Sequence, residues 1–233
     1  MIMRTTDSAR ERMRRLKALS DEVDAASSLF HHGFRILQGY KFATRDADPL
    51  FVCLAGGSEK LLKLTLGLHD MEARGSWPSA SIMQTFGHRI TALNDQVRSL
   101  IQNRCTESTA PGYIQQLLDQ VARDPYIEQI LATLERYAVR GRFYNLDYLG
   151  DKPQPEPSPA ELWEELHQAL LELRPELLAK LASAKWEESR LEINTIIEVS
   201  IRLWCELIAR SWLTGVIGDQ AKQWSSQLGL YQR

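Results

Sequence analysis

Apolar residues recur at helical spacing along almost the whole chain, and this periodicity limits the fold more than any other feature of the sequence. Residues three, four or seven positions apart lie on one face of an α-helix, so each such stripe marks an amphipathic helix. No segment shows the strict alternation of a half-buried strand or the turn of a β-hairpin. The sequence therefore predicts an all-α protein. The clearest stripes consist of Leu54, Leu61, Leu64 and Leu68, of Phe86, Ile90, Leu93, Val97 and Leu100, and of Ile193, Ile197, Ile201, Trp204 and Ile208.

Proline-containing pairs predict where three helices begin. Proline suits the first turn of a helix, because the N–H group that it lacks would have no intrahelical partner there. Asp48-Pro49 and Asp124-Pro125 place a capping side chain directly before a proline, and Ser158-Pro159-Ala160-Glu161 adds a capping box. We expect a helix to begin at each of these points.

A proline-rich stretch, LGDKPQPEPSP at residues 149–159, interrupts the helical pattern. Its four prolines and near lack of apolar residues exclude a continuing helix and predict an extended linker or a long surface loop. It divides the chain into a helical domain of residues 1–148 and a C-terminal helical extension of residues 160–233. The extension contains tryptophans that need cover, so we expect its helices to pack back on the first part. These are Trp163, Trp186, Trp204, Trp212 and Trp224.

Composition and missing motifs exclude several classes of function. With 28 Lys and Arg against 30 Asp and Glu, the net charge of −2 gives no general attraction to nucleic acids or anionic membranes. Cys53, Cys105 and Cys205 stand far apart without a CxxC pair, which favours a reducing cytoplasm over disulfides or a zinc site. The five histidines show no metal-ligand spacing, and the common nucleotide-binding and hydrolase motifs are missing. We therefore expect neither a metal nor a cofactor.

No membrane contact is expected either. The basic segment MIMRTTDSARERMRRLK lacks the apolar core of a secretory signal. The most apolar later segment carries charges at four-residue intervals, which are costly in lipid but can pair along one edge of a helix in a protein core. These charged residues are Glu198, Arg202, Glu206 and Arg210.

The segment AGGSEKLLKLTLGLHD, residues 55–70, places charges in the middle of a leucine-rich helix. Glu59 and Lys63 are one helical turn apart, and Asp70 falls on the same stripe. The simplest interpretation is a solvated edge of salt bridges beside the leucine face. The alternative is that these charges belong to a functional cluster.

His88 stands at the start of the next helical segment, FGHRITALNDQV. With Phe86 at the centre of the apolar stripe, His88 falls roughly opposite it and is not expected in the core. One interpretation is an exposed side chain near a helix start, with Ser81 or Thr85 as the cap. The other is an imidazole that is presented to a ligand or partner.

Three segments, SEKLLKLTLGL, FGHRITALNDQV and RYAVRGRFYNLDYL, resemble in this order the motifs of the HEPN superfamily of bacterial helical domains. The resemblance covers about residues 25–148. It implies an antiparallel helical bundle, frequently dimeric, in nucleotide-linked or RNA-linked roles that include toxin–antitoxin and phage-defence systems. Residues 149–233 would then be helices added outside the recognisable part.

The active ribonucleases of this superfamily resemble one another in an Arg that is followed, after four to six residues, by a His that acts in RNA cleavage. None of the five histidines here has an Arg five to seven positions before it. The resemblance therefore implies a protein that binds rather than cuts, with no residue assigned as catalytic. The candidate ligand-binding residues are Glu59, Lys63, His88, Arg89, Arg140, Arg142 and Tyr144.

Two basic stretches each allow two interpretations. Arg136, Arg140 and Arg142 stand among aromatic residues, a mixture suited to phosphate contact and base stacking. The same arginines also suit a helix end, because the helix dipole favours cations there. The run from Arg10 to Lys17 is either a phosphate-binding surface or a solvated helix face, and the acidic residues nearby favour the second.

Three hypotheses about function follow from these features. The first is a catalytically silent HEPN-like protein, active as a homodimer in the cytoplasm, that binds RNA, a nucleotide or a protein partner. The second is a divergent ribonuclease of the same superfamily, in which His88 acts with Arg142 or Lys63. The third is a structural adaptor that holds another protein through its Trp-bearing C-terminal helices.

Overall fold

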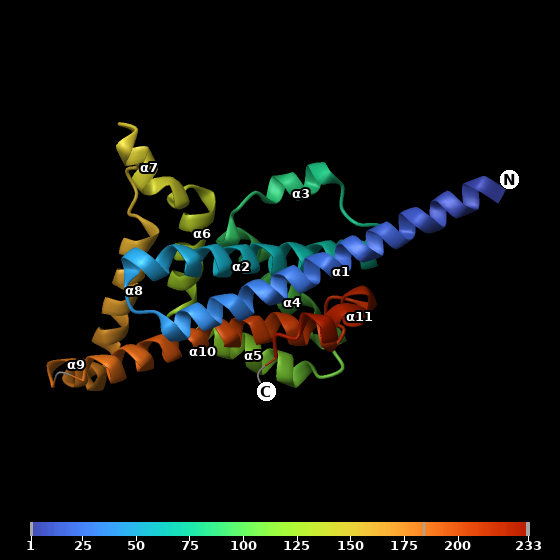
Figure 1. Cartoon of the computed structure of the whole chain (residues 1–233). Helices are drawn as coiled ribbons and strands as arrows, with labels where there is room; N and C mark the ends of the chain where they lie inside the picture. The colour runs from blue at the N-terminus through green and yellow to red at the C-terminus, as the bar shows by residue number, and fades with distance from the viewer. Residues whose placement is uncertain (1, 184, 232–233) are drawn as a thin grey trace.

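The computed structural model describes residues 2–183 and 185–231, with side chains from Ala9 onward. Over these residues the chain forms eleven α-helices, two 3-10 helices and no strand, so the predicted all-α fold is confirmed (Figure 1). The α-helices are α1 (Ile2–Gly39), α2 (Ala43–Arg74), α3 (Ala80–Phe86), α4 (Ile90–Arg104), α5 (Pro111–Arg123), α6 (Ile127–Val139), α7 (Tyr144–Leu149), α8 (Pro159–Leu173), α9 (Pro175–Ala182), α10 (Trp186–Leu213) and α11 (Asp219–Leu228). The 3-10 helices are η1 (Cys105–Glu107) and η2 (Gly141–Phe143).

The long helices α1 and α2 form an antiparallel pair, and the other helices pack around them (Figure 1). Two glycines allow the pair to approach closely, because a Cβ at Gly33 would lie 2.5 Å from Leu54 and one at Gly57 would lie 3.2 Å from Phe30. On one side α2 contacts α4 and α6, and α10 packs against α1, α5 and α11. The result is a helical bundle on which C-terminal helices pack, as the sequence predicts.

One hydrophobic core crosses the proline-rich stretch. Trp163, Trp204 and Trp212 come from the C-terminal part and are buried among residues of α1, α2 and α4 to α6. The indole of Trp204 donates to Oδ1 of Asn94 at 2.8 Å, and that of Trp212 donates to the Thr65 hydroxyl at 2.9 Å. These tryptophans are therefore covered as expected. Trp186 is not, since 63% of it is exposed at the start of α10.

Residues 150–158 form a loop that is tied to the body of the protein. The guanidinium of Arg136 donates to the side chain of Gln154 and to the backbone carbonyls of Glu156 and Pro157. Gln154 in turn donates to the Asp147 carboxylate at 2.7 Å. The predicted capping box at Ser158 is present at the start of α8, so this helix begins where the sequence indicates.

One predicted helix start and the extent of one predicted helix are wrong. Helix α2 begins at Ala43, and Pro49 lies inside it, because Asp46 already accepts the backbone N–H groups of Lys41 and Phe42 at the first turn. The stripe from Phe86 to Leu100 is also not one helix, since α3 ends at Phe86 and α4 starts at Ile90. The cap of α3 is Ser79, whose hydroxyl accepts the N–H of Ile82, and not Ser81 or Thr85.

Helix α10 has the charged edge that its sequence predicts. Glu198 pairs with Arg202 at 2.7 Å and Glu206 pairs with Arg210 at 3.3 Å, so the two nearly buried carboxylates are compensated within the same helix. Among the helices that the structure describes, none is both long and apolar enough to cross a membrane.

Candidate functional site

Glu59, Lys63 and His88 meet at one point on the surface, although His88 is 29 residues from Glu59 in the sequence. One carboxylate oxygen of Glu59 accepts from Nζ of Lys63 at 2.6 Å. The other lies 2.8 Å from Nδ1 of His88. The charged pair from α2 and the histidine from the α3–α4 turn thus form one cluster, which we call the Glu59 site.

A glycine turn and a carboxylate from α6 position His88. Gly87 has φ +54° and ψ −140°, a conformation that a residue with a Cβ adopts only with strain, so the chain can turn sharply after α3. Ile90 then opens α4. Glu135 of α6 accepts both the N–H and the hydroxyl of Thr91, at 2.7 and 2.6 Å, and thereby fixes the start of α4 beside the turn.

The carboxylate of Glu59 is held in its ionised form. Burial alone would raise its pKa, but hydrogen bonds from His88 and Lys63 outweigh this and hold the pKa of Glu59 below its ordinary value. The side chains of Glu59 and Lys63 are only 19% and 21% exposed, whereas that of His88 is 51% exposed. The site therefore has a partly buried ion pair at its base and an accessible imidazole above it.

The contact with Glu59 also fixes which nitrogen of His88 carries a proton. A carboxylate only accepts, so Nδ1 of His88 is the donor and the neutral ring has an unprotonated Nε2. Among the described residues no hydrogen bond reaches Nε2. This nitrogen is therefore available to take up a proton or, once protonated, to donate to an anion. The arrangement suits phosphate contact or general base chemistry.

The other predicted site residues make separate contacts. Arg89 donates to the carbonyl oxygen of Thr85 at 3.0 Å and so closes the α3–α4 turn. Arg140 pairs with Asp147 at 3.1 Å. The guanidinium of Arg142 lies over the ring of Phe143, 5.0 Å from its centroid, and Tyr144 is half-buried at the start of α7.

The Arg140–Arg142 segment does not join the Glu59 site. Arg140 follows Glu135 by five residues, which corresponds to roughly 7 Å along a helix axis. Since Glu135 contacts Thr91, the end of α6 lies beside the start of α4. No direct contact joins Arg140 or Arg142 to Glu59, Lys63 or His88 within the described part of the chain.

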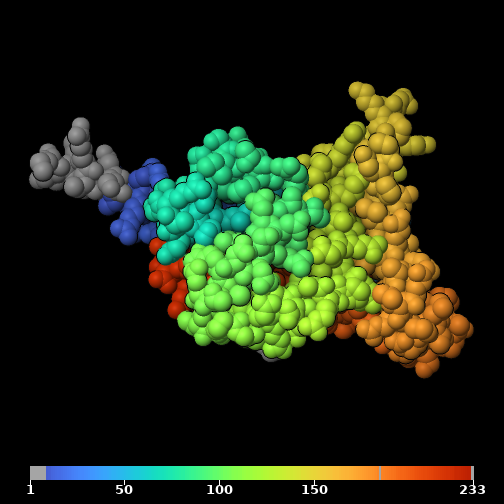
Figure 2. Space-filling model, turned by 180° about the vertical axis from the view of Figure 1, so that it is seen from behind, coloured from blue at the N-terminus to red at the C-terminus, as the bar shows by residue number. Residues whose placement is uncertain are grey.

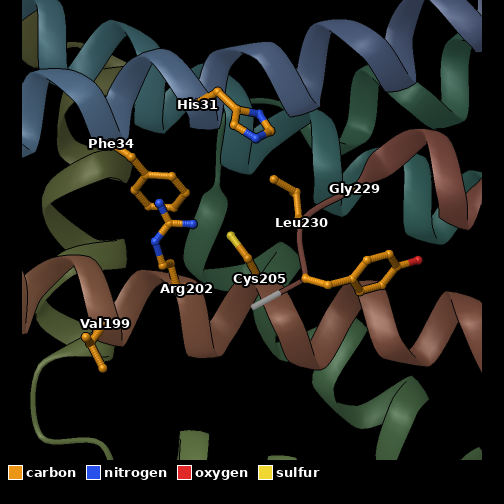
Figure 3. A pocket seen from close by; sticks show the side chains of 8 residues that line it. His31, Phe34, Val199, Arg202, Cys205, Gly229 and Leu230 are labelled. Atoms are coloured by element: carbon orange, nitrogen blue, oxygen red, sulfur yellow. The ribbon is translucent and has the colours of Figure 1, made fainter. Parts of the chain in front are cut away.

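A cavity of about 720 Å³ between α1, α10 and the segment after α11 was not predicted from the sequence. Figure 3 shows Arg202 and Phe34 stacked on each other at one side of it, with the guanidinium 4.0 Å from the ring centroid. Arg202 is already paired with Glu198, and burial raises the pKa of the Cys205 thiol, which stays protonated. The charges that line this cavity are satisfied within the protein. No sequence signal points to it, because its walls come from segments far apart in the chain.

A second contact that the sequence did not reveal joins Arg104 to His69 and Glu107. The guanidinium lies 2.7 Å from Nδ1 of His69 and 2.6 Å from the Glu107 carboxylate. Because arginine only donates, Nδ1 of His69 is the acceptor here. Among the described residues no cluster of three or more His, Cys, Asp or Glu side chains is arranged to hold a metal ion.

Comparison of the sequence with protein-family models found no matching family, and comparisons with curated proteins and with solved structures found no matching protein.

Proposed function

We propose that this chain is a HEPN-like helical protein that binds RNA or a nucleotide through a phosphate group at the Glu59 site and does not cleave it. The observation that supports this most is the half-exposed imidazole of His88, which Glu59 holds beside Lys63. The bacterial defence or toxin–antitoxin setting belongs to the same proposal, since it comes from the resemblance of residues 25–148.

Phosphate binding would use groups that the protein already positions. Protonated Nε2 of His88 would donate to a phosphate oxygen, and the Lys63 ammonium has three N–H groups, of which one is directed at Glu59. A bound RNA strand could then continue toward the exposed Arg142 and Phe143, which lie just beyond the end of α6.

Binding is favoured over cleavage for two reasons. The Arg-to-His spacing of the active ribonucleases is missing from the sequence. Lys63 shares the Glu59 carboxylate with His88, and its charge is partly cancelled by Glu59 at 2.6 Å. A cation in that state stabilises additional negative charge on a reacting phosphate less than a free arginine would.

A divergent ribonuclease is the second candidate, and the Glu59–His88 contact favours it. A carboxylate that fixes the imidazole leaves Nε2 as a base that can take a proton from a ribose 2′-hydroxyl. The two candidates differ in whether the RNA survives. Under the proposed function, a structured RNA stays intact during a long incubation with the pure protein. Cleavage that is lost in His88→Ala would replace the proposal by this candidate.

The binding test uses fluorescence anisotropy with a labelled single-stranded RNA and with a labelled nucleotide. His88→Ala and Lys63→Ala should each weaken binding by about tenfold or more, since a charge-assisted hydrogen bond contributes roughly 1.5–3 kcal/mol. The matched controls are His32→Ala, an exposed histidine on α1, and Lys60→Ala, whose ammonium pairs with Glu22. Equal affinities for all four variants and the unchanged chain would contradict the site.

The assembly state is a separate part of the proposal. A homodimer is expected from the resemblance, and sedimentation of the pure protein measures it directly. A protein partner in place of RNA would be retained after nuclease treatment and in high salt, whereas a nucleic-acid complex would be lost under both conditions.

A further inference from the structure

The first part of α1 extends beyond the body of the protein. Residues 9–18, which we call the arm, are all exposed, and the packing of α1 against other helices begins at Leu19 and Ser20. Figure 1 shows this end of α1 projecting past α2 and α11. Figure 2 shows the same projection from behind.

The arm continues the face of α1 that is buried in the core. Val23 and Phe30 are fully buried and lie seven residues apart. Leu16 lies seven residues before Val23, and Met13 lies three residues before Leu16, so both fall on the same face of the helix. On the arm, however, Leu16 is 38% exposed and Met13 is 67% exposed. The apolar stripe that is buried in the body therefore continues along the arm, where it is exposed to solvent.

Cations stand on both sides of this stripe. At about 100° per residue, Arg10, Arg14 and Lys17 fall on one side of Met13 and Leu16, and Arg12 falls on the other. Lys17 pairs with Asp21, and Arg15 pairs with Glu11 at 3.0 Å. For Arg10, Arg12 and Arg14 no ion pair is found among the described residues. The edges of the stripe thus carry net positive charge, although the whole chain carries −2.

We infer that the arm docks an amphipathic helix of a partner protein whose apolar stripe is flanked by Asp or Glu. Leucine-type residues at the centre would cover Met13 and Leu16, and the flanking carboxylates would pair with Arg10, Arg12 and Arg14. The contact would extend the helix packing of the body by one more helix. This inference does not depend on the function proposed for the Glu59 site.

Charge decides between this occupant and a second copy of the chain. Pairing two arms in either direction would bring the arginines of one beside those of the other, and like charges at such a contact are unfavourable. A lipid surface fits less well, because Ala9, Met13 and Leu16 offer little apolar area for insertion. RNA would use the arginines but would leave the apolar stripe without a role.

Docking would also stabilise the helix itself. The arm is exposed along its whole length, so only its continuity with the packed part of α1 supports its helix, and it can unwind locally. The backbone amides of the arm should therefore exchange with deuterium quickly in the free protein and slowly once a partner helix covers them.

The test uses the full chain and a designed helical peptide of about three heptads, with Leu at positions a and d and Glu at positions e and g. The probe is fluorescently labelled, and binding is followed by anisotropy at two salt concentrations. A second peptide carries Lys in place of Glu, and a third carries Ser in place of Leu. We expect the full chain to bind the Glu peptide, more weakly at high salt, and to bind neither of the others with comparable affinity.

Two arm variants then decide whether binding occurs on this stripe. The double variant Met13→Ser, Leu16→Ser should bind the Glu peptide with an affinity about tenfold or more lower, as expected for a loss of central apolar contacts. The triple variant Arg10→Glu, Arg12→Glu and Arg14→Glu should no longer bind the Glu peptide and should bind the Lys peptide instead. The matched controls, Arg35→Glu on the same helix and Leu173→Ser on α8, should leave binding unchanged.

Four outcomes would overturn the inference. These are no binding of the Glu peptide by the full chain, equal binding of all three peptides, binding that survives in both arm variants, and binding that is lost equally in the controls. An RNA oligonucleotide or vesicles with anionic lipid that bind through the arm more tightly than the Glu peptide would assign the arm to that ligand instead.

Discussion

The Glu59 site and the Arg136–Tyr144 segment both combine basic and polar side chains, but the fold uses their charges differently. In the segment, Arg136 is committed to the 150–158 loop and Arg140 to Asp147. At the Glu59 site, Lys63 and His88 share one carboxylate. Nε2 of His88 has no hydrogen-bond partner among the described residues. The difference shows that a cluster of arginines in a sequence is weak support for a ligand site until their partners are known.

The largest effect on stability is expected from Arg136→Ala. This change removes three hydrogen bonds and leaves the carbonyls of Glu156 and Pro157 without a donor, which should lower the free energy of unfolding by roughly 3 kcal/mol. Urea denaturation measures it. RNA binding at the Glu59 site should be unchanged at temperatures where the variant is folded. Arg136→Ala without a loss of stability would mean that this arginine is free for a ligand after all.

Gly87→Ala tests whether the turn positions His88. The conformation of Gly87 strains any residue with a Cβ, although no neighbouring atom would clash with it. We expect a loss of roughly 1–3 kcal/mol in the free energy of unfolding together with weaker ligand binding, because the turn would shift His88 away from Glu59. The matched control is Gly112→Ala, which also has open space around it but no positive φ. Equal effects of both changes would contradict the role of the turn.

Glu59→Gln removes the charge that holds Lys63 and His88 and should cost about 1 kcal/mol of stability at neutral pH. The pKa of Glu59 is lowered in the folded state, so the stabilisation is present above the ordinary pKa of a glutamate and is lost as the pH falls through the folded pKa. The stability difference between the unchanged chain and Glu59→Gln should therefore shrink below about pH 4.5. A difference that stays constant down to pH 3 would show that the ionised carboxylate is not what stabilises the site.

The effect of Glu59→Gln must be measured as the difference in the free energy of unfolding between the two proteins at each pH, because His167 also makes stability depend on pH. Burial lowers the pKa of His167 to about 4, below its value in the unfolded chain. The unfolded state therefore binds a proton first, and stability falls as the pH decreases from about 6.5 toward 4 in both proteins alike.

The smallest effect is expected from Arg140→Ala. Its pair with Asp147 lies near the surface, with 52% and 28% of the two side chains exposed, so the loss in stability should be below about 1 kcal/mol. The RNA affinity of this variant tests whether the Arg136–Tyr144 segment takes part in ligand binding. We expect less than a twofold change, and a loss as large as that of His88→Ala would extend the ligand site into this segment.

Local features of the fold could be predicted from the sequence. The helical class follows from apolar spacing, and the start of α8 follows from the capping box at Ser158. The Glu59–Lys63 pair follows from residues one turn apart on α2. The same reasoning was wrong at Gly87, because the apolar stripe continues across the break between α3 and α4 and spacing alone does not register a turn.

Helical segments, apolar faces and charge pairs within one helix can be predicted from the sequence, because they depend on residues fewer than about eight positions apart. The contacts of His88 with Glu59, of Glu135 with the start of α4 and of Arg136 with Gln154 become visible only in the folded chain. Each of these contacts joins separate elements. Which residues meet across elements depends on how the helices pack. The apolar spacing within one helix does not predict which neighbouring helix packs against it.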